Sequence, residues 1–286
     1  MKVSEIIKGE KPVLSFEVFP PKTSESYESV KSSALGVAAL KPDFMSVTYG
    51  AGGSTDTYTL DIAESILKAG VTPIAHLTCV CATKDKIRSM LTQFKNSGVE
   101  NILALRGDLP QGITKESLDF TYASDLVDEI KKSGDFCVGG ACYPENHPES
   151  NTITKDIENL KKKVDAGCEF LTTQMFFDNN ILYNFLYRIR EAGITVPVIP
   201  GIMPITNVAQ IKRTCALSGT ILPRRFIRMV DRFGDNPAAM KQAGIAYATE
   251  QIIDLYANGL NAVHVYSMNK PDVAEKIQNN LKDIIG

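Results

Sequence analysis

The stretch LTQFKNSGVENILALRGD, residues 91–108, contains the pattern that predicts the fold. Its first half is an apolar-periodic segment that ends at Gly98, and a glycine just past a helix commonly takes the left-handed conformation that closes the helix. The run Asn101–Arg106 that follows is short and mostly apolar, as a strand covered on both faces should be. Gly107–Asp108 then follows the strand. The stretch therefore predicts a helix, a closing glycine and a buried strand with a polar end.

The same pattern recurs along the chain. Apolar-periodic segments end at Gly70, Gly98, Gly134, Gly167, Gly193, Gly219 and Gly259. Predicted strands lie at Val13–Phe19, Phe44–Tyr49, Pro73–Cys79, Asn101–Arg106, Cys137–Cys142, Phe170–Phe176, Val196–Gly201 and Ala262–Ser267. Eight strands alternating with helices predict a closed (β/α)8 barrel of the TIM type. An open doubly wound sheet is the structural alternative, but the segment after the first strand lacks its G-x-G-x-x-G phosphate turn.

The segments between the strands carry helical signals. Apolar residues recur at helical spacing at Ile157, Leu160 and Val164, and again at Ile181, Leu182, Phe185, Leu186 and Ile189. Proline at the first helical position predicts that helices begin at Pro237, after Asn236, and at Pro271. The gap from about Gly201 to Ala262 has room for an extra helix or two. Because no linker interrupts the chain, we expect residues 1–286 to form one catalytic domain.

The composition argues against several classes of protein. A formal net charge of −2 provides no basic surface for nucleic acid. The N-terminus MKVSEIIKGEKP lacks the apolar core of a signal peptide, and no stretch approaches the roughly 18 apolar residues of a membrane helix. The six cysteines form no CxxC pair and no Cys/His cluster at zinc spacing. We expect a cytoplasmic protein with reduced thiols, without a metal site and without nucleic-acid or membrane partners.

Polar side chains gather at the ends of the predicted strands, which share one rim of a barrel. Glu17 lies in an apolar strand, where burying a carboxylate is costly, so a functional role is favoured over a structural charge paired to a lysine. Arg106 and Asp108 alone would fit a salt bridge that closes a turn equally well, and His76 alone would more often be a hydrogen-bonded core residue. We interpret His264 as structural. Convergence of such groups from five or six strands is how a barrel builds a site.

The residue types at this rim limit the chemistry. The three histidines lack the spacing of a metal triad, no G-x-S-x-G nucleophile turn is present, and no cysteine adjoins an obvious base. One acid, Glu17, among polar donors suits proton donation to a substrate whose harder chemistry is done by a cofactor.

Eight segments, in family order from about residue 13 to residue 272, resemble those of methylenetetrahydrofolate reductases. They are FEVFPPKTSE (16–25), VTYGAGGS (47–54), AHLTC (75–79), LALRGDLP (103–110), ACYPENHPE (141–149), TTQMFFD (172–178), PGIMPITN (200–207) and HVYSMNK (264–270). The chain resembles the short bacterial form. The resemblance implies the catalytic barrel alone, without the C-terminal regulatory domain of animal enzymes and without inhibition by S-adenosylmethionine through it.

The resemblance implies that FAD is held non-covalently at the carboxyl ends of the strands. The implied contacts are Thr48, Tyr49, His76, Arg106, Gly107, Asp108, Ala123, Tyr143, His147, Ser150, Asp156, Asn159, Lys162 and Lys163. Arg106, Lys162 and Lys163 can neutralise a pyrophosphate. The run Lys161–Lys163 on its own would predict only a solvated helix face.

The resemblance also assigns roles toward the substrate. Glu17 matches the family's general acid, which protonates a folate nitrogen as the methylene bridge opens. Asp108 matches a carboxylate that lies near both the flavin and the pterin. Gln174 matches a residue that contacts both the nicotinamide donor and the folate. The implied substrate-binding positions are Thr48, Asp108, Gln174, Gln210 and Lys270. Lys270 replaces an arginine of some relatives and meets a carboxylate as a point charge, and Thr214 stands where a relative has an aromatic contact.

The implied reaction is the reduction of 5,10-methylenetetrahydrofolate to 5-methyltetrahydrofolate by ping-pong hydride transfer. NADH, or less favoured NADPH, is the implied donor, the product would supply methyl groups for methionine synthesis, and relatives assemble as homo-oligomers. Two alternatives remain open at this point. One is a related barrel flavoenzyme such as a proline dehydrogenase, and the other is a folate-reducing subunit that receives electrons from a partner protein.

Overall fold

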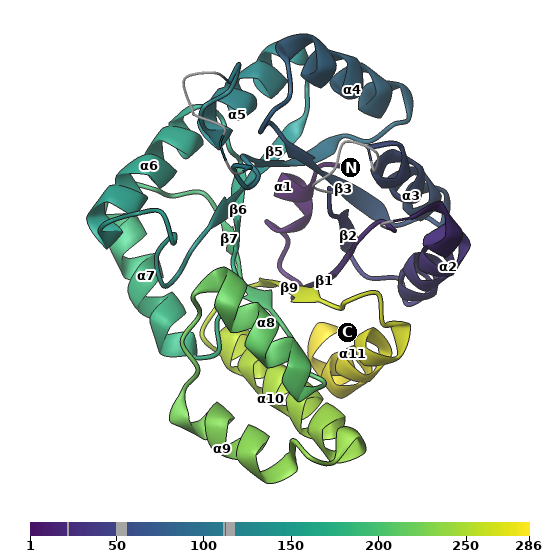
Figure 1. Cartoon of the computed structure of the whole chain (residues 1–286), viewed down its shortest axis with the longest axis vertical. Helices are drawn as coiled ribbons and strands as arrows, with labels where there is room; N and C mark the ends of the chain where they lie inside the picture. Colours follow the sequence, from purple (N-terminus) through teal and green to yellow (C-terminus); the bar gives the residue numbers. More distant parts are fainter. Residues whose placement is uncertain (22, 50–55, 111, 113–117) are drawn as a thin grey trace.

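The computed structural model describes residues 1–21, 23–49, 56–110, 112 and 118–286. Its strands are β1 (Val13–Val18), β2 (Phe44–Val47), β3 (Thr72–Thr78), β4 (Asn101–Leu105), β5 (Cys137–Cys142), β6 (Phe170–Thr173), β7 (Val198–Ile199), β8 (Gly201–Ile202) and β9 (Ala262–Tyr266). Each strand pairing within these residues is parallel. Figure 1 shows the strands as a ring with helices outside it.

The nine strand segments occupy eight barrel positions, because β7 and β8 are two pieces of one strand. Pro200 separates them and has no N–H to donate, which interrupts the ladder. β7 pairs with β6 on one side, whereas β8 pairs with β9 on the other. β9 in turn pairs with β1, so the ring closes. The predicted (β/α)8 barrel is confirmed.

The helices other than the first surround this ring, and the first lies within the outline of the ring (Figure 1). They are α1 (Val3–Ile6), α2 (Tyr27–Ala38), α3 (Asp56–Lys68), α4 (Lys84–Asn96), α5 (Ala123–Ser133), α6 (Ile153–Asp165), α7 (Asn179–Glu191), α8 (Val208–Ser218), α9 (Arg224–Phe233), α10 (Pro237–Ala257) and α11 (Pro271–Ile285), with a 3-10 turn at Ser24–Ser26. The predicted starts at Pro237 and Pro271 are confirmed, and the Asn236 side chain accepts hydrogen bonds from the first turn of α10. The extra helices predicted in the long gap are α8 and α9.

Two details of the expected pattern were wrong. Six of the seven glycines that end helical segments have positive φ, but Gly134 has φ 164° and is extended. There the chain leaves α5 directly in an extended conformation, and the ring of Phe136 covers the glycine. β2 and β6 also end before Tyr49 and Phe176, although one further backbone hydrogen bond continues each ladder.

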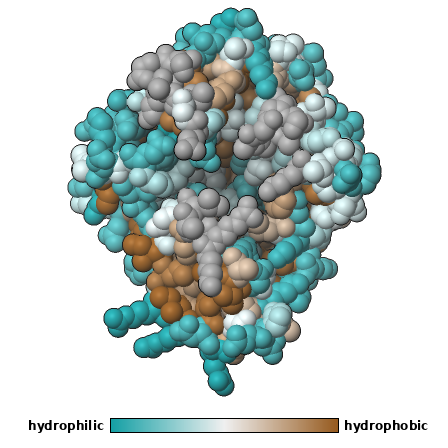
Figure 2. Space-filling model, in the orientation of Figure 1, coloured by the Kyte–Doolittle hydropathy of each residue, from teal (hydrophilic) through white to brown (hydrophobic). Residues whose placement is uncertain are grey.

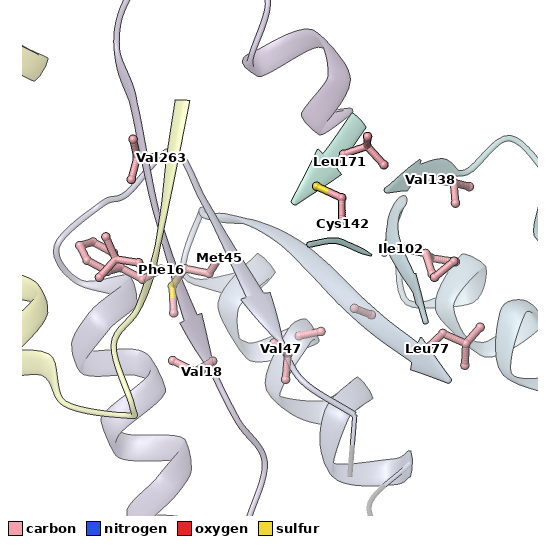
Figure 3. Packing of buried hydrophobic residues seen from close by; sticks show 14 of the residues in the cluster. Phe16, Val18, Met45, Val47, Leu77, Ile102, Val138, Cys142, Leu171 and Val263 are labelled. Atoms are coloured by element: carbon pink, nitrogen blue, oxygen red, sulfur yellow. The ribbon is translucent and has the colours of Figure 1, made fainter. Parts of the chain in front are cut away.

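The strands alternate their side chains between two apolar layers. Residues that point away from the barrel axis pack against the surrounding helices and form the larger core (Figure 3). Residues that point inward at the amino ends of the strands form a second cluster, with one residue from each barrel position: Val13, Phe44, Ile74, Leu103, Cys137, Phe170, Ile199 and Ala262. Val3 and Ile7, in and just after α1, join this cluster. The N-terminal segment therefore plugs the end of the barrel opposite the rim, which the sequence did not reveal.

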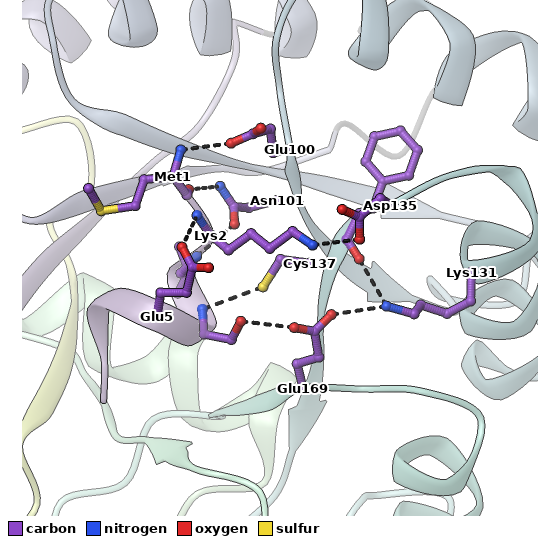
Figure 4. A network of polar contacts seen from close by, with 12 residues as sticks. Met1, Lys2, Glu5, Glu100, Asn101, Lys131, Asp135, Cys137 and Glu169 are labelled. Atoms are coloured by element: carbon purple, nitrogen blue, oxygen red, sulfur yellow. Dashed lines mark hydrogen bonds and ion pairs between the residues drawn. The ribbon is translucent and has the colours of Figure 1, made fainter. Parts of the chain in front are cut away.

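Polar contacts hold the plug in place (Figure 4). The buried Asn101 side chain accepts a hydrogen bond from Val3 N at 2.8 Å and donates to Met1 O at 3.1 Å and Pro73 O at 3.2 Å. Ser4 Oγ donates to Glu169 at 2.8 Å. These bonds satisfy backbone groups that burial would otherwise leave unpaired.

Within the described ranges, none of the helices is both long and apolar enough to cross a membrane. The same residues contain no group of three or more His, Cys, Asp or Glu side chains arranged to hold a metal ion.

Candidate functional site

The Glu17 carboxyl lies inside the barrel near its rim. β1 alternates, so that Phe16 and Val18 pack outward while Glu17 points inward. Its side chain is 19% exposed, and Oε2 lies 3.7 Å from Nε2 of His76. Burial raises the pKa of Glu17 to about 8, although a hydrogen bond from Ser46 opposes part of this rise. The carboxyl is therefore mostly protonated at neutral pH.

His76 is not an ionic partner for this carboxyl. Burial lowers the pKa of the imidazole to about 3, so the ring is neutral at physiological pH. Its buried Nε2 has no hydrogen-bond partner among the residues that the structure describes. The proton on Glu17 is therefore kept by removal of water and not by a neighbouring cation.

His264 lies deeper in the barrel, between two serines. Ser15 Oγ is 2.7 Å from its Nδ1 and Ser46 Oγ is 2.9 Å from its Nε2, and burial lowers the pKa of the ring to about 3. Ser15 Oγ also donates to Val263 O at 3.0 Å. Both ring nitrogens of His264 therefore have a serine hydroxyl as partner, in keeping with a structural role. Ser46 lies between His264 and Glu17 and can donate its single hydroxyl proton to only one of them at a time.

Two adjoining cavities open beside this interior at the carboxyl ends of the strands, with volumes of about 600 Å³ and about 380 Å³. Their shared wall consists of Arg106, Ala123, Ala141, Tyr143, His147 and Lys163. Every predicted cofactor contact except Thr48 and His76 lines one cavity or both. Figure 2 shows the hollow near the centre of this face.

The predicted substrate contacts Gln174, Gln210 and Lys270 line neither of these two cavities. The structure brings the last two together through Thr206. Lys270 Nζ donates to Thr206 Oγ1 at 2.8 Å, and Gln210 Oε1 accepts from Thr206 N at 3.2 Å. Gln174 Oε1 accepts from Met175 N at 2.9 Å. Sequence reasoning missed Thr206, although it lies in the quoted segment PGIMPITN.

The three lysines of the run on α6 have different environments. Lys161 is 3.4 Å from Asp165 in a surface pair, as a solvated face requires. Lys162 is exposed and lines the smaller cavity. Lys163 turns inward and donates to Ala141 O at 2.6 Å, where burial lowers its pKa. Lys163 therefore departs from the solvated-face interpretation, and Lys162 combines an exposed side chain with a place on the cavity wall.

Arg106 is held by Glu149, a partner that the sequence analysis did not single out. The guanidinium forms two hydrogen bonds to this carboxylate, one of them at 2.7 Å, and the pair raises the pKa of Arg106. Gly107, at φ 87°, carries the chain past Val80, whose Cγ1 lies 2.6 Å from where a Cβ would be. Asp108 then projects exposed into the larger cavity.

The loop between β5 and α6 is fixed by Asp156. Its carboxylate accepts from His147 N at 3.0 Å and from Ser150 Oγ at 3.1 Å. The His147 ring meets Tyr143 edge-on, with ring centroids 4.5 Å apart. Asp156 therefore shapes the wall of the smaller cavity by holding this loop.

Thr214 and Thr48 lie outside the walls of the two cavities. Thr214 is 8% exposed and its hydroxyl lies 3.7 Å from Met203 Sδ, so it faces the protein interior. In the segment VTYGAGGS, residues 50–54 lie outside the described residues. Thr48, just before them, donates its N–H to Val18 O at 3.0 Å and accepts from Thr59 Oγ1 at 3.0 Å.

Comparison with known proteins identifies relatives along nearly the whole chain. Residues 2–282 match the family model described as methylenetetrahydrofolate reductase. The 5,10-methylenetetrahydrofolate reductase of Escherichia coli strain K12 is 38% identical over 269 residues, which is 94% of this chain and 90% of that protein. The probable methylenetetrahydrofolate reductase (NADH) of Oryza sativa subsp. japonica is 37% identical over 295 residues, covering 98% of this chain and 50% of the rice protein.

Solved structures support the fold. An uncharacterised protein from Clostridium thermocellum, described as binding two copies of 5-methyl-5,6,7,8-tetrahydrofolic acid, aligns with a TM-score of 0.66 at 15% identity. The alignment covers 98% of this chain and 99% of that one. A 2,3-dimethylmalate lyase aligns with a TM-score of 0.54 at 10% identity, covering 98% of this chain and 85% of the lyase.

Proposed function

Because this chain belongs to the methylenetetrahydrofolate reductase family, we propose that it reduces 5,10-methylenetetrahydrofolate to 5-methyltetrahydrofolate with FAD as cofactor and NADH as donor. Bound FAD would accept hydride from the nicotinamide and pass it to the one-carbon unit of the folate in a ping-pong sequence. The buried position of the Glu17 carboxyl inside the barrel, where burial raises its pKa, is the observation that carries the assignment of the acid.

The two adjoining cavities suit an elongated cofactor with an anionic centre. Lys155, Lys162 and Lys163 contribute ammonium groups to the smaller cavity, and α5 begins at its wall, where a helix N-terminus favours an anion. Lys163 is partly stripped of water, and among the described residues its ammonium donates to the Ala141 carbonyl. An anionic pyrophosphate here would compensate its buried charge.

Arg106 and the aromatic wall would serve the remainder of the cofactor. Arg106 can reach an anion in either cavity once its bonds to Glu149 are exchanged for bonds to the ligand. Tyr143 and His147 offer ring surface on the wall that both cavities share. Asp108, exposed in the larger cavity, would accept hydrogen bonds from the amino-pyrimidine edge of a pterin.

Glu17 would protonate the folate nitrogen as the methylene bridge opens to the electrophilic iminium. A general acid works best when its pKa is near the working pH, and the pKa of Glu17 is raised to about 8. Gln174, Gln210 and Lys270 would hold the substrates. Lys270 can meet a carboxylate of the folate glutamate, as a point charge, while Thr206 orients its ammonium.

NADH is the proposed donor because the rice relative is named for it. Formation of 5-methyltetrahydrofolate would provide methyl groups for methionine synthesis. Assembly as a homo-oligomer, a cytoplasmic location and a single catalytic domain remain predictions.

The test is to follow the flavin absorbance anaerobically in the two half-reactions, with Glu17→Gln compared with wild type. We expect NADH to bleach the flavin of both proteins, and methylenetetrahydrofolate to reoxidise only the wild type at a normal rate. Exposed Glu10→Gln is the matched control and should behave as wild type. Equal loss of both half-reactions in Glu17→Gln would contradict the assigned role, and flavin reduction by proline would indicate the proline dehydrogenase alternative.

A further inference from the structure

The turn between β9 and α11 has an unusual backbone. Met268 and Asn269 are consecutive non-glycine residues with φ of 55° and 53°. Asparagine enters this left-handed region more readily than most residues, whereas methionine does so rarely. Such a conformation persists only where surrounding contacts hold it. The contacts that hold this turn therefore point to its structural role.

The turn holds the end of β1 at Glu17 and at Phe19, two residues beyond it. Asn269 Oδ1 accepts from Phe19 N at 2.9 Å and its Nδ2 donates to Phe19 O at 2.9 Å, so one amide satisfies both backbone groups of that residue. Ser267 Oγ donates to the backbone O of Glu17 at 2.7 Å. The β1–β9 ladder ends at Glu17 and Tyr266. Side chains of the turn therefore take over where the ladder stops.

The next residue in the turn is one of the proposed folate contacts. Lys270 directly follows Asn269, and its ammonium reaches Thr206, which is joined in turn to Gln210. One short turn thus connects the strand that carries Glu17 to the side chains that would grip the substrate. A shift of this turn would change the distance between the proton donor and its acceptor.

We propose that Asn269 is a positioning residue for the reaction, whose two hydrogen bonds to Phe19 hold the Glu17 carboxyl in register with the substrate contact at Lys270. The inference rests on the proposed role of Glu17 as proton donor. Asn269 itself touches neither the reacting atoms nor, in this assignment, the substrate.

The environment of Glu17 provides a readout that general destabilisation would not change. The titratable groups facing it are His76 on β3 and Tyr266 on β9, both neutral at pH 7, and Ser46 on β2 supplies a hydroxyl. Burial is what raises the pKa of Glu17. If the end of β1 loosens, water reaches the carboxyl and its pKa falls toward the ordinary value.

The experiment compares Asn269→Gly with Met268→Gly as the matched control. Glycine accepts the left-handed conformation at either position, so both variants keep the turn geometry, but only Asn269→Gly removes the two bonds to Phe19. Ser267→Ala removes the bond to Glu17 O and provides an independent second variant. The measurements are the rates of both half-reactions with FAD-loaded protein between pH 6 and 9, and thermal unfolding by circular dichroism.

We expect Asn269→Gly to lower the limiting rate of the folate half-reaction by roughly 10- to 100-fold, as a misplaced catalytic group does. Its pH midpoint should move to lower pH, while the rate of flavin reduction by NADH stays within about twofold of wild type. Ser267→Ala should change in the same direction, and Met268→Gly should match wild type.

A folate half-reaction of Asn269→Gly with unchanged rate and pH midpoint would overturn the inference, as would equal effects of Asn269→Gly and Met268→Gly. If Asn269→Gly does not fold, Asn269→Asp replaces it, because aspartate keeps the acceptor for Phe19 N and loses the donor. Failure of the proposed function is distinguishable, since Glu17→Gln would then leave the folate half-reaction intact.

Discussion

Glu17 and His76 lie with Oε2 and Nε2 3.7 Å apart, yet they do not form an ion pair. Burial raises the pKa of the carboxyl to about 8 and lowers the pKa of the imidazole to about 3, so both groups are neutral at pH 7. A charged pair here would have to repay the desolvation of two ions. The barrel therefore presents a neutral proton donor whose strength as an acid is set by exclusion of water.

Glu17→Gln is expected to stabilise the protein at neutral and alkaline pH. The folded pKa of about 8 lies above the ordinary value of 4.5, so the unfolded chain loses its proton first, and stability falls as the pH rises from about 4.5 to about 8. Glutamine does not titrate and removes this loss. The gain at pH 8 should be about 2–4 kcal/mol, with little difference at pH 4.5, measured by urea unfolding. Absence of a pH-dependent gain would show that the carboxyl is not desolvated.

Lys162→Gln should weaken FAD binding, whereas Lys161→Gln should not. The two residues are neighbours on α6, but Lys162 lines the smaller cavity and Lys161 pairs with Asp165 on the surface. Loss of one exposed cationic contact to a phosphate corresponds to roughly 1 kcal/mol, or about a fivefold rise in Kd. Flavin fluorescence titration at two salt concentrations measures both variants. Equal Kd values for the two variants would place the pyrophosphate elsewhere.

Asn101→Ala should destabilise the protein by about 2–4 kcal/mol, because it leaves Val3 N, the buried Pro73 O and the partly buried Met1 O without their partner. Asn96→Ala, an exposed position at the end of α4, is the matched control and should change stability by less than about 0.5 kcal/mol. Guanidinium unfolding gives both values. A small effect of Asn101→Ala would mean that the plug contributes little to the stability of the barrel.

The fold could be predicted because its signals are local. A helix that ends in a left-handed glycine, as at Gly98, and a short apolar strand after it are visible within about 20 residues, and eight predicted strands alternating with helices leave few topologies. Gly134 shows the limit of this inference. Its sequence context matches the others, but packing of Phe136 against it selected an extended conformation.

The site could be predicted only as a set of residue types at one rim. Residue order placed Glu17, Arg106 and Lys270 at strand ends, and the family resemblance suggested their roles. The partners of these groups were not visible, because Glu149 is 43 residues from Arg106 and Thr206 is 64 residues from Lys270. Closure of the barrel brings such distant residues together.

The sequence by itself determined the alternation of helices and strands, the place of Glu17 in the first apolar strand and the clustering of polar residues at one rim, because these follow from short-range periodicity and from the parallel direction of the strands. Only the tertiary structure decided the protonation of Glu17, the separate environments of three adjacent lysines, the plug formed by α1, and the contacts of Asn269 with Phe19. Each of these depends on burial or on hydrogen bonds between segments far apart in the chain. Neither the burial nor these hydrogen bonds exist until the barrel has closed.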